Sequence, residues 1–191
     1  VISGTASQIN TIVAASGDNQ NQYNLKSDVS FTVTDTGTVN ASVLNIINAA
    51  TTGLVDASSV TTLNGTASSI TTLIGNEGTS GNKVALDTDF VITVSSGTAT
   101  VDQVNTMGAF STSGAITATL SNTDIADLDD LTTSNSDQLT ISIASTSATA
   151  TQLNTVDSST GIQVSASSIT SITGAATDAN TAYDSIGISG L

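Results

Sequence analysis

Four aspartates, Asp124, Asp127, Asp129 and Asp130, form the densest group of charged side chains in the sequence. Carboxylates combined with backbone carbonyls are the ligands that Ca²⁺ prefers. Carboxylates are also common in the first turn of a helix, where they cap the backbone and complement the helix dipole. The sequence leaves both interpretations open. It contains neither an EF-hand loop nor the glycine-rich nonapeptide of calcium-binding β-rolls, so a calcium site here would be irregular.

Other catalytic chemistry has few residues to work with. The 191 residues include no histidine, cysteine or arginine, so most hydrolase, transferase and kinase sites cannot be assembled. A carboxylate pair of the glycosidase kind would remain, but nothing in the sequence singles out two aspartates for it. We therefore expect a protein that is not an enzyme and that has no cofactor other than, as a candidate, Ca²⁺.

The composition is acidic, with few charged residues. Only 9% of residues are charged, and the net charge of −14 disfavours binding to nucleic acid or to anionic membranes. No stretch approaches the roughly 18 consecutive apolar residues of a membrane span, so we expect no membrane insertion. Asp, Asn, Ser, Thr and Gly dominate the polar residues, which is typical of turns and strands.

A short phrase recurs along the chain: a small or apolar residue, two polar residues, an aliphatic, two polar residues and another apolar residue. Such self-similarity predicts a repeat architecture. The residue after the central aliphatic is Asn, Thr or Asp in every copy. The nine copies begin at Ala6, Ala41, Ala57, Ala67, Val101, Ile125, Ala150, Ala166 and Ala176.

Core packing does not explain a polar position that recurs in this way. In stacked coils, such residues can form a ladder that satisfies backbone groups of neighbouring coils. The alternative is a displayed polar row that binds a ligand. The expected ladder residues are Asn10, Asn45, Thr61, Thr71, Asn105, Asn154, Thr170 and Asn180, and Asp129 has the same place in its copy.

The elements that would position these residues are short. Alternation of β-branched and polar residues predicts strands at 29–33, 90–94, 115–120 and 139–143. The phrase advances in threes, which predicts a single short α- or 3₁₀-turn, capped by a preceding Thr or Ser. Glycines are expected to end the turn or the loop after it, at Gly17, Gly53, Gly108 and Gly161.

A strand and a short helix that alternate with a step of about 24 residues are typical of solenoids. We therefore expect a β/α solenoid with a parallel sheet, and an all-β helix or a β-sandwich is the alternative. Residues 41–73 align with 150–182, which indicates a duplication of about 109 residues. The expected domains are the end of a preceding repeat unit at 1–22 and repeat units at 23–83, 84–149 (divergent) and 150–191 (incomplete).

Five segments carry a family resemblance: Ala41–Asn45, Thr52–Gly53, Ala57–Leu63, Ala179–Tyr183 and Gly187–Leu191. In their wording the chain resembles tandem repeats of giant surface or secreted proteins of marine picocyanobacteria. The resemblance implies an extracellular or cell-surface location and an association with calcium that is frequent in such proteins. No catalytic residues carry over from it.

These observations favour an extracellular structural repeat module that assembles with copies of itself or with neighbouring repeats into a surface layer, filament or giant adhesin. A calcium-dependent adhesin module that binds a glycan or another surface is the first alternative. A virion fibre segment is the second. Threonine alternation such as Thr117-Ala118-Thr119 leaves an ice-binding solenoid as the third.

Overall fold

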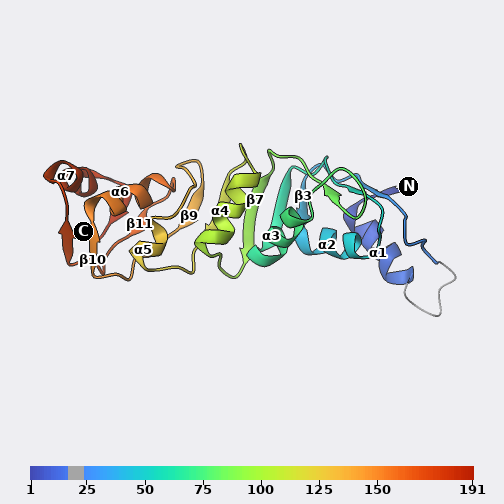
Figure 1. Ribbon diagram of the computed structural model, residues 1–191, viewed down its shortest axis with the longest axis horizontal. Coiled ribbons are helices and arrows are strands. Elements are labelled where there is room, and N and C mark those ends of the chain that lie inside the picture. Colours follow the sequence, from blue (N-terminus) through green and yellow to red (C-terminus); the bar gives the residue numbers. More distant parts are fainter. Residues whose placement is uncertain (17–23) are drawn as a thin grey trace. The chain divides into compact units, whose positions relative to one another are not determined.

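The structure of the protein is a computed structural model that describes residues 1–16 and 24–191. These residues form an α/β fold in which short helices alternate with short parallel strands (Figure 1). The chain divides into two compact units. Unit 1 contains Val1–Thr93 and Phe110–Gly114, and unit 2 contains Val94–Ala109 and Ala115–Leu191. Among the described residues, no helix is long and apolar enough to cross a membrane.

Unit 1 contains a four-stranded parallel sheet in the order β1-β2-β4-β6, a parallel pair β3-β5, and three helices. Helix α2 contacts both α1 and α3, and Figure 1 shows the three helices beside one another. The elements are β1 (Ile2–Gly4), α1 (Ala6–Ser16), β2 (Phe31–Val33), β3 (Thr38–Asn40), α2 (Ala41–Ala49), β4 (Val55–Asp56), β5 (Thr62–Thr66), α3 (Ala67–Gly75) and β6 (Val84–Ala85).

Unit 2 contains three parallel strand pairs, β8-β9, β10-β12 and β11-β13. Helix α6 contacts α5 and α7. Strand β7 (Val91–Ser96) and helix α4 (Val101–Phe110) each contain a point of division between the units. The remaining elements are β8 (Ile116–Thr119), α5 (Ile125–Leu128), β9 (Gln138–Thr140), β10 (Ser147–Thr149), α6 (Ala150–Ser158), β11 (Val164–Ser165), β12 (Ser171–Thr173), α7 (Ala176–Asp184) and β13 (Ile188–Ser189).

The strand register follows a step close to the expected one. Thr38 of β3 pairs with Thr62 of β5, and Ser147 of β10 pairs with Ser171 of β12, a separation of 24 residues in both cases. The step is shorter in β8-β9 and longer in β4-β6. Because a parallel pair needs a crossover connection, each helix lies on the path between two paired strands.

Seven copies of the phrase form helices, and each of these helices begins at the first residue of its copy. Most have nine to eleven residues, so the expectation of a single turn is wrong for them. The phrase buries its first, fourth and seventh residues, which extends the apolar stripe over two turns. In α2 these residues are Ala41, Leu44 and Ile47, all fully buried.

The copies at Ala57 and Ala166 are the exceptions, because each forms one tight turn between two strands. Val60 N donates to Ala57 O over 3.1 Å, and Ile169 N donates to Ala166 O over 3.0 Å. These two copies therefore show the single turn that the phrase predicts. Strands β4 and β11 end directly before them, and the next strands, β5 and β12, begin soon afterwards.

The four strands expected from alternation are present as β2, β7, β8 and β9. The other strands have two to five residues, most of them too few for a period of two to show in the sequence. The all-β helix and the sandwich are wrong for the described residues, because helices alternate with the parallel strand pairs of each unit. Gly108 lies inside α4 and does not end it, and Gly17 lies outside the described residues.

Candidate functional site

A hydrogen bond from an asparagine side chain joins successive helices in both units. In unit 1, Asn45 Nδ2 of α2 donates to Ser69 O of α3 over 2.8 Å. In unit 2, Asn154 Nδ2 of α6 donates to Asp178 O of α7 over 3.1 Å. Each bond runs from the fifth residue of one helix to the third residue of the next, 24 residues along the chain.

Asn105 of α4 makes a related pair of bonds within unit 2. Its Nδ2 donates to Asp130 O over 2.9 Å, and its Oδ1 accepts from Thr132 N over 2.9 Å. In contrast, the Oδ1 atoms of Asn45 and Asn154 are buried without a hydrogen-bond partner. Burial of an unpaired carbonyl oxygen costs free energy, so these two asparagines contribute less than a fully paired amide would.

The threonines of the two turn copies form bonds in the opposite direction along the chain. Thr61 Oγ1 donates to Thr36 O over 3.0 Å, and Thr170 Oγ1 donates to Thr146 O over 3.1 Å. Their partners lie 25 and 24 residues earlier. The position after the central aliphatic therefore joins successive segments in helical copies and in turn copies alike.

The other expected ladder residues have different surroundings. Thr71 Oγ1 donates within its own helix, to Ala67 O over 3.1 Å. Asn10 lines a hollow of about 230 Å³ that Asp35 also lines. Asn180 is exposed on α7.

A second row of hydroxyl groups follows the helices, and the sequence analysis missed it. Thr160 Oγ1 donates to Leu139 O over 3.1 Å, and Ser111 Oγ donates to Phe90 O over 2.6 Å. Thr51 Oγ1 donates likewise to Val29 O. These three hydroxyl side chains are buried, and each satisfies a carbonyl of an earlier segment.

Glycines beside these hydroxyls allow the close approach. A β-carbon at Gly53 would lie 2.6 Å from Val29 O, and one at Gly161 would overlap Asn135 O. Backbones can approach this closely only where no side chain intervenes. A Ser or Thr followed within three residues by glycine, shortly after a helical phrase, is the sequence signal that could have identified this row.

Two of the four clustered aspartates make hydrogen bonds around α5. Asp124 Oδ1 accepts from Ala126 N and from Ser145 Oγ, both over 3.1 Å, and so caps the helix. Asp127 Oδ2 accepts from Asn122 Nδ2 over 3.0 Å. The helix-start interpretation therefore describes the place of Asp124.

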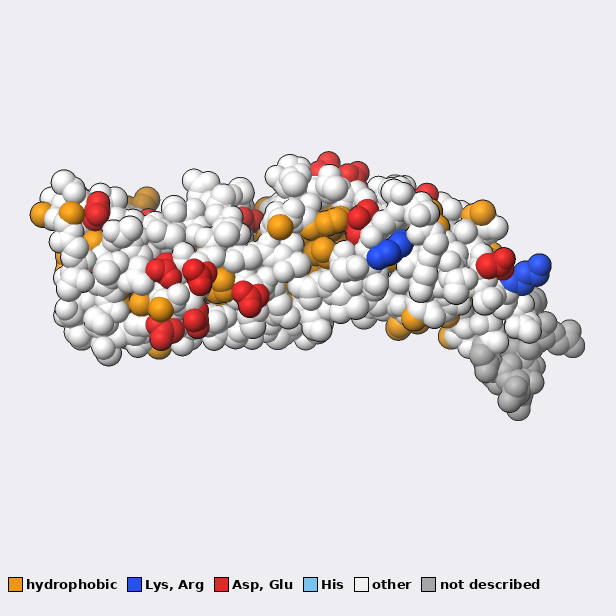
Figure 2. Space-filling model, viewed as in Figure 1, with side chains coloured by type: hydrophobic (Ala, Val, Ile, Leu, Met, Phe, Trp, Pro, Cys, Tyr) orange, Lys and Arg blue, Asp and Glu red, His pale blue; other side chains and the backbone are white. Residues whose placement is uncertain are grey.

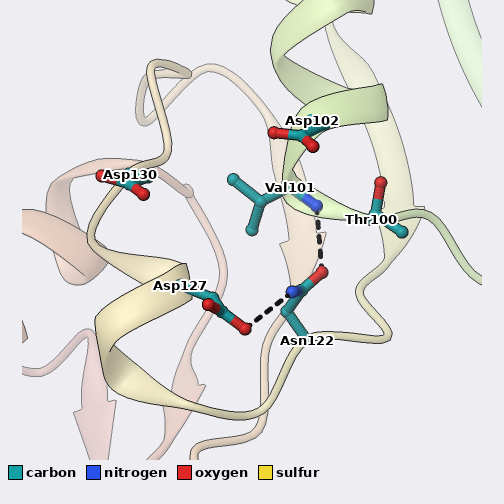
Figure 3. A pocket seen from close by; sticks show the side chains of 6 residues that line it. All are labelled: Thr100, Val101, Asp102, Asn122, Asp127 and Asp130. Carbon is teal, nitrogen blue, oxygen red and sulfur yellow. Dashed lines mark hydrogen bonds between the residues drawn. The ribbon is translucent and has the colours of Figure 1, made fainter.

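The other two aspartates lie on either side of a small hollow. Asp129 Oδ2 accepts from Gln152 Nε2 of α6 over 2.9 Å, whereas Asp130 faces a hollow of about 120 Å³ at the start of α4. Figure 3 shows Asn122 between this helix start and Asp127, with its Oδ1 accepting from Val101 N over 3.1 Å. The hollow is lined by Thr100, Val101, Asp102, Asn122, Asp127 and Asp130.

The structure thus brings Asp127 and Asp130 together with Asp102, which the sequence analysis did not include. Figure 2 shows acidic side chains gathered over the segment that contains α4 and α5. Within residues 1–16 and 24–191, no group of three or more His, Cys, Asp or Glu side chains is arranged to hold a metal ion. The four-aspartate set is therefore divided between a helix cap, a contact with α6 and the hollow.

Comparison with known proteins adds no relative. No protein-family model matches the sequence, and searches of curated proteins and of solved structures found no significant match.

Proposed function

We propose that this chain is a non-catalytic structural repeat module, built as a β/α solenoid, of an extracellular surface layer, filament or giant adhesin. The observation that carries the proposal is the asparagine bond present in both units. Asn45 and Asn154 occupy the same place in their helices, and each donates to the third residue of the next helix. Side chains used in the same way in each unit serve stacking, whereas an active site needs one unique set of groups.

The pairing of strands supports the solenoid. In each unit, a strand pairs in parallel with a strand one step along the chain, and the following helix contacts the next helix. In repeat proteins of this kind, each coil buries its apolar side chains mainly against its neighbours. Parallel strands with exposed edges can also pair with further strands, which favours assembly between copies.

Charge supports an extracellular setting. The net charge of −14 keeps the surface strongly hydrated, and absence of cysteine means that folding does not depend on redox conditions. The resemblance to giant surface proteins of marine picocyanobacteria points to the same setting. Self-assembly then requires contacts that tolerate like charge, which hydrogen-bonded rows and apolar faces provide.

Sedimentation velocity over a hundredfold range of concentration, combined with electron microscopy, tests the proposal. We expect species larger than the monomer, elongated particles, and a melting temperature that rises with protein concentration. A chain that stays monomeric at the highest concentration would contradict the assembly function.

A calcium-dependent adhesin is the second candidate, because Asp102, Asp127 and Asp130 share the hollow beside α4. Carboxylate oxygens in such a hollow are suitable ligands for Ca²⁺. Melting in millimolar Ca²⁺ and in EDTA tests this function. A melting temperature that is the same in both solutions contradicts it and leaves the structural module.

A further inference from the structure

The row of asparagine bonds has an exposed next member. Asn180 is the fifth residue of α7, the same place that Asn45 and Asn154 occupy in α2 and α6. Those two asparagines are partly buried against the following helix, whereas Asn180 is exposed. Its side chain is therefore accessible for the contact that its two counterparts make.

The partner of this row is always a carbonyl in the first turn of a helix. Ser69 O and Asp178 O are third residues of α3 and α7. The third residue of α1 is Gln8, which is exposed, and α1 begins with a reciprocal cap in which Gln8 N donates to Thr5 Oγ1 and Thr5 N donates to Gln8 Oε1. The first turn of α1 is thus rigid and accessible.

Resting on the proposed assembly function, we propose that α7 of one chain stacks against α1 of a second copy, with Asn180 Nδ2 donating to Gln8 O. The contact would continue the helix stacking that α2-α3 and α6-α7 already show within the chain. It joins two different surfaces, so it is head-to-tail and generates open filaments unless the rotation closes a ring.

Apolar side chains on the two surfaces fit this contact. Tyr183 at the end of α7 is 61% exposed and Ile186 is 93% exposed. In unit 1, α1 contributes to an apolar hollow of about 410 Å³, lined by Ile2, Thr11, Ile12, Ala15 and Leu25. A hollow of this volume can accept an aromatic or aliphatic side chain of a second copy, and such anchors supply most of the free energy of an interface.

Charge also favours α1 as the partner. Helix α7 has Asp178 in its first turn and Asp184 at its end. Helix α1 contains no acidic residue, and Lys26, one of the two cations of the chain, follows Leu25 of the hollow. An acidic helix therefore meets a neutral helix with a cation beside its hollow, which limits repulsion between two acidic molecules.

Cysteine crosslinking tests the contact in the full chain, which contains no cysteine of its own. Asn180→Cys and Gln8→Cys chains are mixed under mild oxidation. An intramolecular control carries Asn154→Cys and Asp178→Cys, the observed counterpart of the same contact. A disulfide forms only where two Cα atoms lie within about 7 Å, so crosslinking reports this geometry.

We expect mixed dimers of Asn180→Cys with Gln8→Cys, at concentrations where neither variant alone forms them in comparable yield. Absence of mixed dimers, while the intramolecular control closes, overturns the contact, and so does an equal yield of Asn180→Cys homodimers. If unmodified chains assemble in sedimentation but give no mixed dimers, the contact is wrong and the assembly function stands. If they do not assemble, both are wrong.

Asn180→Ala provides a second measurement that keeps the fold. We expect it to weaken association about threefold to tenfold, the loss of one hydrogen bond. Thr181→Ala is the matched control, because the Thr181 hydroxyl donates to Thr177 O of its own helix and its removal leaves the proposed contact intact. Equal association constants for Asn180→Ala and the unmodified chain overturn the proposed bond.

Discussion

The helix pair α2-α3 in unit 1 and the pair α6-α7 in unit 2 have the same plan but different interiors. Both pairs follow strands paired at a 24-residue step, and both contain the asparagine bond between helices. In α3, the apolar stripe consists of Ala67, Ile70 and Leu73, all buried. In α7, the corresponding residues are alanines, and Ala182 alone is buried among the residues of this helix.

The helix starts differ in the same direction. Thr66 caps α3, with its Oγ1 accepting from Ser69 N over 3.1 Å, whereas Ala175 precedes α7 and supplies no side-chain cap. The second pair has therefore lost apolar volume and a cap while retaining the bond from Asn154. This comparison indicates that the polar row specifies how helices align, and that apolar filling sets how strongly they hold.

Removal of apolar volume from the stronger pair should have the largest effect. Leu73→Ala gives α3 the alanine found in α7, and we expect a loss of about 3–5 kcal/mol in unfolding free energy, because Leu73 is fully buried. Urea denaturation measures the loss. Its control is Thr72→Ala at an exposed position, and a loss below about 1 kcal/mol for Leu73→Ala would show that the stripe does not distinguish the pairs.

Glycines of the hydroxyl row should be sensitive in both units. Gly53→Ala in unit 1 and Gly161→Ala in unit 2 each place a β-carbon against a carbonyl of an earlier segment, and we expect each to destabilise by about 1–3 kcal/mol. Thermal melting compares them. Gly37→Ala is the matched control, because open space surrounds that position, and an equal effect at all three sites would exclude close approach as the cause.

Loss of the asparagine bond should affect the two pairs equally. Asn45→Ala and Asn154→Ala each remove one hydrogen bond, and we expect about 0.5–1.5 kcal/mol for each, reduced by release of the unpaired Oδ1. Hydrogen exchange of amides in α3 and in α7 measures each pair separately. A large effect in only one pair would show that the row does not serve the same purpose in both.

A cap added to the weaker pair should give the smallest change. Ala175→Thr supplies α7 with the residue that caps α3, and we expect a gain of about 0.5–1 kcal/mol. Thr66→Ala is the reverse change and should cost a similar amount. Hydrogen exchange in the first turns of α3 and α7 tests both, and unchanged exchange in α7 would show that its start is limited by packing.

Some features of the fold could be predicted because they depend on local sequence. The phrase marks the first residue of every helix, since its apolar spacing and the preceding Thr, Asn or Asp act within one or two turns. Alternation located β2, β7, β8 and β9 in the same way. The polar position after the central aliphatic was identified as a link between segments, but not its donors and acceptors.

Other features could not be predicted, because their partners lie more than 20 residues apart. Nothing local separates the turn at Ala57 from the helix at Ala67, since both copies have the same spacing of residue types. The difference follows from β4, which pairs with β2 and β6 and so fixes the chain directly before Ala57. Likewise, Asp130 joined Asp102 at the hollow only through packing of distant segments.

By itself, the sequence determined the chemistry available to this protein, an acidic surface without histidine, cysteine or arginine, and the starts of its helices. Only the tertiary structure decided which copies of the phrase are helices, which hydroxyls and glycines meet an earlier backbone, and which aspartates share a hollow. The physical reason is range. Capping and apolar periodicity act over a few residues, whereas parallel pairing and helix stacking join segments about 24 residues apart.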